Sequence, residues 1–128
     1  MKKRYVGRFA PSPSGPLHMG SLVTALGSYL QAKVHDGKWL LRIDDIDPPR
    51  MIAGSSEGIQ ATLSAHGLNW DGDPVFQSNN YERYEKALNT LHSLNATYPC
   101  VCTRAQIKAK GGHYTGTCRD KHQVQGVS

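Results

Sequence analysis

Residues 8–21, RFAPSPSGPLHMGS, decide the fold class because they join a predicted strand to a predicted helix through a loop without regular structure. A short strand is predicted from Tyr5 to Phe9, which overlaps the start of this stretch. Three prolines and a glycine then exclude helix or strand. Apolar residues next recur at helical spacing, at Leu22, Val23, Leu26, Leu30 and Val34. The sequence therefore predicts a strand, a loop and a helix in this order.

The start of this predicted helix is suited to binding phosphate. A helix that begins near Gly20 and Ser21 presents unpaired backbone N–H groups and the positive end of its dipole. His18 immediately precedes it, where the imidazole can donate a hydrogen bond to a phosphate oxygen. The alternative interpretation is a proline-rich loop that only caps a helix. The pattern favours nucleotide chemistry.

A second segment, KWLLRIDDIDPPR at residues 38–50, places carboxylates at the end of a strand. Its first half is predicted to be a buried strand, and Asp44, Asp45 and Asp47 follow it. In an open α/β sheet, ligands bind at the carboxyl ends of the strands. The alternative is a solvated acidic turn ended by two prolines.

The third group of candidate functional residues contains all three cysteines, Cys100, Cys102 and Cys118. An odd number of cysteines without a secretory signal argues against disulfides, and clustered thiolates favour a metal, most often zinc. A closed tetrahedral site needs a fourth ligand. From the residues alone, His113, Tyr114 and His122 all remain candidates, and three unrelated reduced cysteines are the alternative to a metal site.

Two further helices are predicted between these segments. Residues 55–68 should form an amphipathic helix, with core positions at Ile59, Ala61, Leu63 and Leu68. After a turn at residues 69–74, residues 77–94 should form another helix. Its apolar side is predicted to pack, and it consists of Tyr81, Tyr84, Leu88 and Leu91.

Length and charge set wider bounds on the protein. The 128 residues suffice for one small domain, and the net charge of +5 is compatible with a nucleic-acid partner. The basic start, residues 1–4, is not followed by an apolar run, so we expect no secretory signal and a cytoplasmic protein. The most apolar helix, residues 21–34, is too short and too polar to span a bilayer, so no membrane role is expected.

Taken together, the motifs resemble those of a known family. RFAPSPSGPLHMGS resembles the signature of class I aminoacyl-tRNA synthetases of the glutamyl type, whose HIGH tetrapeptide is here His18-Met19-Gly20-Ser21. RIDDIDPPR resembles the RIEDIDPPR of the glutamyl-queuosine tRNA(Asp) synthetases, and residues 20–22 and 25–30 favour the same group. Asp44 stands where this family usually has glutamate.

The resemblance implies an α/β fold, the N-terminal half of a class I synthetase Rossmann-type fold with parallel strands, flanking helices and a small zinc-binding insert. It assigns residues 1–96 to the first half of the nucleotide-binding catalytic domain, residues 97–122 to the insert, and residues 123–128 to a polar tail. Nothing after Arg119 resembles the family's KMSKS-type loop. We therefore expect a C-terminal half to be missing.

The resemblance also implies three sets of site residues. The L-glutamate site would consist of Arg8, Phe9, Ala10, Pro11, Ser12 and Asp44. The ATP site, which uses Mg²⁺, would include His18, Gly20 and Ser21. The ligands of one structural Zn²⁺ would be Cys100, Cys102, Tyr114 and Cys118.

The implied activity is the ATP-dependent activation of L-glutamate and its transfer to the queuosine of tRNA(Asp). We expect this activity to be impaired in a chain of 128 residues. Two alternatives remain: a non-catalytic zinc module that binds tRNA or another partner, and a fragment of a glutamyl-tRNA synthetase.

Overall fold

The computed structural model describes residues 4–122, with side chains described as far as Arg119, so the predicted tail at residues 123–128 lies outside the described residues. The chain divides into two compact units, residues 1–81 and 82–128. The domain boundary after residue 96, which the resemblance implies, stays a prediction.

The first unit is built on a parallel sheet. Strands β1 (Val6–Phe9), β2 (Lys38–Ile43) and β3 (Val75–Phe76) lie in the order β1-β2-β3, and both neighbouring pairs are parallel. The strands predicted at residues 5–9 and in the first half of 38–50 are confirmed. Parallel strands with helices between them define an α/β fold, as the sequence predicts.

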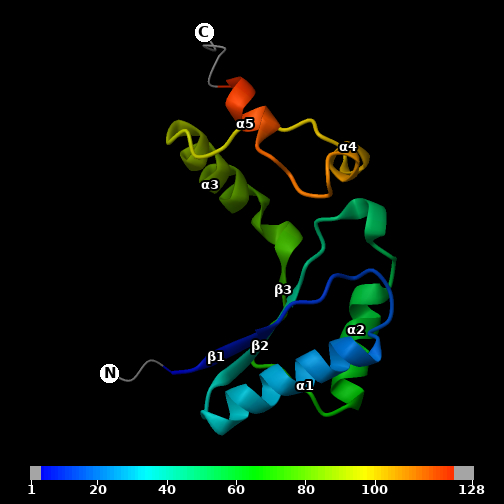
Figure 1. The fold of residues 1–128 in the computed structure, drawn as a ribbon. Coiled ribbons are helices and arrows are strands. Elements are labelled where there is room, and N and C mark those ends of the chain that lie inside the picture. Colours follow the sequence, from blue (N-terminus) through cyan, green and yellow to red (C-terminus); the bar gives the residue numbers. More distant parts are fainter. Residues whose placement is uncertain (1–3, 123–128) are drawn as a thin grey trace. The chain divides into compact units, whose positions relative to one another are not determined.

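Two helices separate the strands along the chain. Helix α1 (Met19–Val34) connects β1 to β2, and α2 (Ser55–Ala65) follows β2 after the short 3-10 turn η1 (Pro48–Arg50) (Figure 1). Helix α1 packs closely on the sheet because Gly7 has no side chain: a Cβ there would lie 3.2 Å from the Ser28 carbonyl oxygen and 3.3 Å from Trp39 Cδ1. The predicted helix start near Gly20 is confirmed to within one residue.

The core of the first unit lies between this sheet and the two helices. Its largest fully buried side chains are Trp39, Leu41, Ile43, Ile59 and Leu63. The predictions for Ile59, Leu63 and Leu68 are confirmed, although α2 ends at Ala65 and Leu68 follows it after Gly67, whose φ of +71° turns the chain. The prediction for Ala61 is wrong, since its side of α2 faces solvent.

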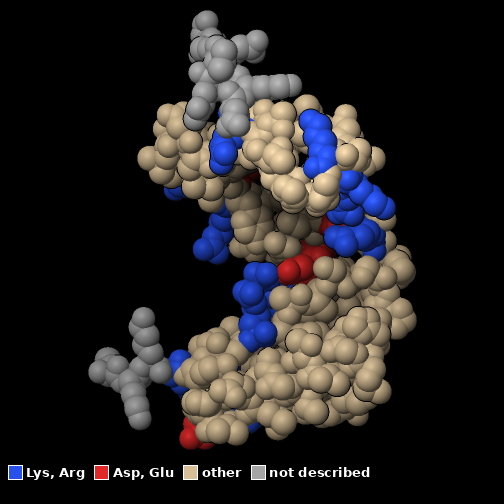
Figure 2. Space-filling model, in the orientation of Figure 1, with Lys and Arg blue, Asp and Glu red and all other residues tan. Residues whose placement is uncertain are grey.

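Helix α1 turns its small residues, not its large ones, toward the sheet. Ala25 and Ala32 are fully buried. Of the large apolar residues that predicted the helix, Leu22 is half-buried and the other four are exposed, by 62% for Val23 and 79% for Val34. Figure 2 shows few charged side chains on the surface in the region of α1 and α2. Helical periodicity therefore located the helix correctly, while an apolar stripe on α1 remains open to solvent.

Asp45 joins the end of β2 to the turn that follows β3. Its Oδ1 accepts a hydrogen bond from the Ser78 backbone N–H at 2.8 Å, and its Oδ2 accepts one from Ser78 Oγ at 2.6 Å. Ser78 lies in the 3-10 turn η2 (Gln77–Asn80). Burial alone raises the pKa of Asp45, but the bonds from Ser78 outweigh it and hold the pKa below the ordinary value of 3.8. The carboxylate therefore stabilises the connection between β2 and η2.

Replacing Asp45 with asparagine should lower the free energy of unfolding by about 1–2 kcal/mol at pH 7, because the bonds to Ser78 lose their charge assistance. The folded pKa is depressed, so this contribution is complete above pH 3.8 and disappears as the pH falls through the folded pKa. Urea unfolding at pH 7 and at pH 3 measures both effects. An equal difference between the two proteins at both pH values would contradict this role of Asp45.

The described part of the second unit, residues 82–122, contains three helices but little buried apolar surface. They are α3 (Tyr81–Ser93), α4 (Arg104–Ala109) and α5 (Thr117–His122), and α3 begins at the last residue of the first unit. The helix predicted at residues 77–94 is therefore observed as η2 followed by α3. Its apolar side, predicted to pack, is exposed by 39–53% at Tyr81, Tyr84, Leu88 and Leu91. Among residues 82–119, only Gly116 and Cys118 are buried.

Within residues 4–122, no helix combines the length and the apolar character needed to cross a lipid bilayer.

Candidate functional site

A cavity of about 350 Å³ lies where the loop after β1 enters α1. Its lining includes seven residues of the predicted glutamate and ATP sites, which are Phe9, Ala10, Pro11, Ser12, His18, Gly20 and Ser21. The loop itself adds Ser14, Gly15, Pro16 and Leu17. The volume is within the range of small-molecule sites. The structure thus brings together the predicted phosphate-binding residues and most of the predicted glutamate wall.

The side chain of His18 is oriented by Ser21. His18 Nδ1 accepts a hydrogen bond from the Ser21 backbone N–H at 3.2 Å, which caps the first turn of α1. In a neutral imidazole whose Nδ1 is an acceptor, Nε2 carries the proton. His18 Nε2 lies 3.2 Å from Ser21 Oγ, so Nε2 donates to this hydroxyl. His18 therefore offers an N–H donor beside the helix N-terminus.

Gly20 gives the imidazole its space. A Cβ at Gly20 would lie 3.1 Å from His18 Cε1 and 3.2 Å from His18 Nδ1, closer than side chains normally approach. A larger residue at this position would require the ring to shift by a few tenths of an ångström. The absence of a side chain at Gly20 therefore leaves room for the His18 imidazole.

Arg8 and Asp44, the two charged residues of the predicted glutamate site, do not line this cavity. Gly7 and Phe9 are buried toward α1, so Arg8, which lies between them in β1, is on the opposite face of the sheet. Arg42 holds the Asp44 carboxylate with both ends of its guanidinium, through Nε to Oδ1 at 2.6 Å and Nη2 to Oδ2 at 3.1 Å. The Asp44 charge is therefore already paired.

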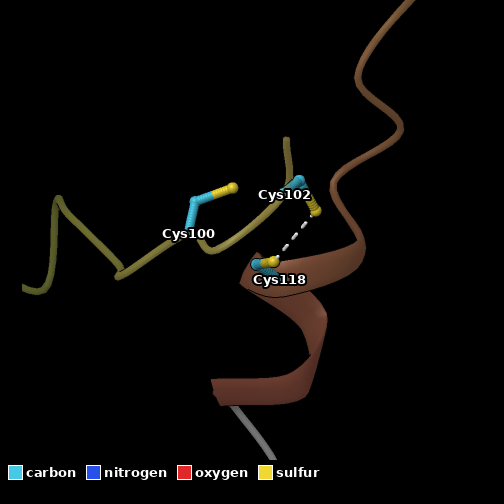
Figure 3. A group of neighbouring side chains, drawn as sticks. All are labelled: Cys100, Cys102 and Cys118. Carbon is cyan, nitrogen blue, oxygen red and sulfur yellow. Dashed lines mark hydrogen bonds between the residues drawn. The ribbon is translucent and has the colours of Figure 1, made fainter. Parts of the chain in front are cut away.

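The three cysteines lie together in the second unit, between the segment before α4 and the start of α5 (Figure 3). Their sulfur atoms all lie within 4.8 Å of one another, and Cys102 Sγ is 3.4 Å from Cys118 Sγ. Zinc–sulfur bonds of about 2.3 Å in tetrahedral geometry place the sulfur atoms about 3.8 Å apart. The spacing of these thiols therefore fits a single metal ion.

Tyr114 is the candidate fourth ligand that the structure ties to this cluster. Its Oη accepts a hydrogen bond from the Cys118 backbone N–H at 2.9 Å, and its ring stacks on Tyr98 with centroids 6.5 Å apart. The exposed His113 has Nδ1 3.3 Å from the Gly111 carbonyl oxygen, a contact within its own turn. The side chain of His122 lies outside the described residues.

The acidity of Cys102, Tyr114 and Cys118 differs. The backbone N–H of Val101, followed by the Cys102 thiol, lowers the pKa of Cys118 to about 7. The hydrogen bond with Cys118 and burial raise the pKa of Cys102 to about 11. Burial and the bond with Tyr98 raise the pKa of the Tyr114 phenol. Of these two thiols, Cys118 is thus the one that more readily supplies a thiolate for a metal.

The second unit carries most of the chain's net charge. Residues 82–128 contain seven Lys and Arg against three Asp and Glu. Figure 2 shows Lys and Arg side chains on the visible surface. This imbalance is compatible with a phosphate-bearing partner.

Some residues around these sites were not identified from the sequence. The pairing of Arg42 with Asp44 could have been predicted, because Arg42 lies two residues before Asp44 and side chains alternate along a strand. Ser55 bonds to Gly15, 40 residues away, and Tyr98 stacks on Tyr114. The spacing of these residues along the chain does not predict either contact.

A parallel sheet with helices between its strands, together with a second unit that holds three neighbouring thiols, defines the class as an α/β protein with a candidate phosphate site and a candidate metal site. The model of the family "tRNA synthetases class I (E and Q), catalytic domain" matches residues 5–126. The chain belongs to this family.

Curated relatives and solved structures agree with this assignment. The chain is 58% identical over 120 residues to the glutamyl-Q tRNA(Asp) synthetase of Photobacterium profundum, covering 93% of this chain and 38% of the relative. It is 56% identical over 118 residues to the protein of the same name from Yersinia pseudotuberculosis, covering 92% and 36%. A glutamate tRNA ligase structure from Elizabethkingia meningosepticum, in complex with its amino acid, matches with a TM-score of 0.71 and 35% identity, covering 88% of this chain and 25% of that one.

The chain spans less than half the length of the curated relatives it matches. These relatives are synthetases by name, and the activity of this chain is a separate question.

Proposed function

We propose that the chain provides the ATP site and part of the glutamate site of a glutamyl-queuosine tRNA(Asp) synthetase. The observation that carries the proposal is the cavity that joins His18, Gly20 and Ser21 to the wall formed by residues 9–12. The identity of 56–58% to glutamyl-Q tRNA(Asp) synthetases supports this substrate assignment over that of the glutamate tRNA ligases, which match at 33–35%.

In the proposed reaction, a glutamate carboxylate oxygen attacks the α-phosphorus of ATP. The bond from the α-phosphorus to the bridging oxygen breaks, and pyrophosphate leaves with the electron pair. Catalysis then depends on positioning and on donors aimed at the developing charge. His18 Nε2–H and the free N–H groups of the first turn of α1 are such donors. Mg²⁺ bound to ATP would neutralise the triphosphate further.

The glutamyl group would then pass to a hydroxyl of the queuosine cyclopentenediol in tRNA(Asp). The hydroxyl attacks the carbonyl carbon of the adenylate, loses its proton, and AMP leaves. The basic second unit is the part of the chain that we assign to phosphate contacts with the tRNA, and such contacts position the RNA without reading its sequence.

The glutamate site requires Asp44 to share its charge. Arg8 offers a bidentate fork for a carboxylate, and Asp44 would receive the amino group. The Asp44 carboxylate already accepts two hydrogen bonds from Arg42. The ammonium of glutamate would therefore add to, or compete with, an existing ion pair.

The proposed metal is one structural Zn²⁺ held by Cys100, Cys102, Cys118 and Tyr114. The spacing of the thiols and the bond from Cys118 N–H to Tyr114 Oη support this set. A bound Zn²⁺ would organise the second unit and takes no part in the reaction described above.

Glutamate-dependent ATP–pyrophosphate exchange tests the proposal. We expect little exchange from the chain alone, and exchange when it is mixed with a polypeptide made of the remaining residues of the Photobacterium profundum relative. In the mixture, glutamate should be transferred to queuosine-containing tRNA(Asp) and not to tRNA(Glu). The same tRNA(Asp) lacking queuosine is the matched control.

Each other outcome selects a different function. Charging of tRNA(Glu) would favour a glutamyl-tRNA synthetase. Binding of RNA without any binding of ATP or glutamate would favour the non-catalytic module, for which the charge of the second unit is the supporting observation. A full exchange rate from the chain alone would show that these residues suffice for activation.

A further inference from the structure

The loop that lines the candidate ATP cavity has few backbone donors with which to hold itself in place. Pro11, Pro13 and Pro16 have no N–H group. The N–H of Ser14 donates locally, to the Ser12 carbonyl oxygen at 2.9 Å. The position of the loop must therefore depend substantially on bonds from other parts of the chain.

The segment between β2 and α2 provides these bonds. The Asp44 N–H donates to the Pro11 carbonyl oxygen at 2.9 Å, and the Ile52 N–H donates to the Pro13 carbonyl oxygen at 2.9 Å. Both are backbone contacts and depend only indirectly on the side chains at these positions. They attach the first half of the loop to the end of β2 and the segment after η1.

Ser55 holds the second half of the loop through its side chain. Its Oγ accepts a hydrogen bond from the Gly15 N–H at 3.0 Å and donates one to the Gly15 carbonyl oxygen at 2.9 Å. Ser55 is 8% exposed, and within residues 4–119 it is the one polar side chain that is buried. One hydroxyl thus satisfies both backbone groups of Gly15, which lies three residues before His18.

The conformation of Gly15 makes this bond consequential. Its φ of +135° is one that residues with a side chain rarely adopt, and glycine itself has little intrinsic preference for a single conformation. A bond to both its N–H and its C=O selects one orientation of the peptides on either side. These peptides lead directly to Pro16, Leu17 and His18.

We infer that Ser55 is a positioning residue of the ATP site, acting through Gly15 on the loop that places His18. The identity of the ligand, ATP, rests on the proposed function. The bonds between Ser55 and Gly15 do not depend on it. Ser56 provides the matched control, because it is the adjacent residue and its hydroxyl contacts Gln60 within α2 instead of the loop.

Three variants of the full chain test the inference: Ser55→Ala, Ser55→Thr and Ser56→Ala. We expect Ser55→Ala to accelerate amide hydrogen exchange at Gly15 about tenfold, since its N–H loses its acceptor, and to weaken the binding of Mg²⁺-ATP by about tenfold. Exchange at Leu63, buried within α2, should stay unchanged. Ser55→Thr retains the hydroxyl and should restore both values, and Ser56→Ala should alter neither.

Two results would overturn the positioning role. Equal acceleration at Gly15 and Leu63 would show that Ser55 only stabilises the fold. Faster exchange at Gly15 with unchanged ATP affinity would show that the loop position does not matter for binding. If the unmodified chain binds no ATP, the proposed function fails, while exchange at Gly15 still decides whether Ser55 holds the loop.

Discussion

Replacing Cys118 with serine is expected to unfold residues 82–119 in zinc-containing buffer while the sheet of the first unit remains folded. The second unit cannot rely on an apolar core, since only Gly116 and Cys118 are buried among its described residues, and the apolar side of α3 is exposed. Structural zinc contributes roughly 10 kcal/mol or more to small metal-dependent folds. The loss of one thiolate should therefore remove most of what stabilises this unit.

Amide spectra and bound zinc per chain, measured together, check this expectation. Chelation of the metal from the unmodified chain should produce the same spectrum as Cys118→Ser. A Cys118→Ser chain that binds no zinc and still shows native amide signals for residues 82–119 would contradict a metal-dependent fold. Signals from β1 and β2 serve as the internal reference, because these strands have a buried core of their own.

The same measurement identifies the fourth ligand. Tyr114→Phe retains the ring that stacks on Tyr98 and removes only the oxygen, so a lower zinc affinity would assign that oxygen to the metal. His113→Ala is the matched control and should leave zinc affinity unchanged, since His113 contacts its own turn. A lower zinc affinity in His113→Ala, with no change in Tyr114→Phe, would instead assign His113 as the fourth ligand.

Replacing His18 should lower glutamate-dependent ATP–pyrophosphate exchange in the reconstituted mixture by about 100-fold, which is typical for the loss of one donor to a developing charge. His18 has two roles to separate, because its Nδ1 caps α1, whereas its Nε2 carries a proton beside Ser21 Oγ in the lining of the cavity. A single substitution with alanine would remove both. The experiment therefore needs a variant that separates them.

His18→Asn separates capping from catalysis. Asparagine is among the best N-cap residues, so this variant should keep the stability of the chain, whereas His18→Ala should lose about 1 kcal/mol. Both should lose the exchange activity if the imidazole stabilises phosphate charge. Full activity in His18→Asn would show that His18 only caps the helix. Thermal unfolding of each variant provides the stability comparison.

The strand, loop and helix around residues 8–21 could be predicted from the sequence because each depends on local properties. Proline and glycine exclude regular structure, and a period of 3.6 residues identifies α1 wherever its apolar side points. The three cysteines could be grouped for a similar reason, since close spacing and an odd number already favour a metal. These features, with the resemblance to glutamyl-type synthetases, led to the family that the comparisons confirm.

Other properties were decided only by tertiary structure, because they depend on which surfaces meet. The sheet accepts Ala25 and Ala32 of α1 and leaves Val23 and Val34 exposed, and periodicity alone does not say which side of a helix packs. Ser55 reaches Gly15 across 40 residues. Propensity acts over a few residues, whereas the placement of these side chains follows from packing between distant segments of the chain.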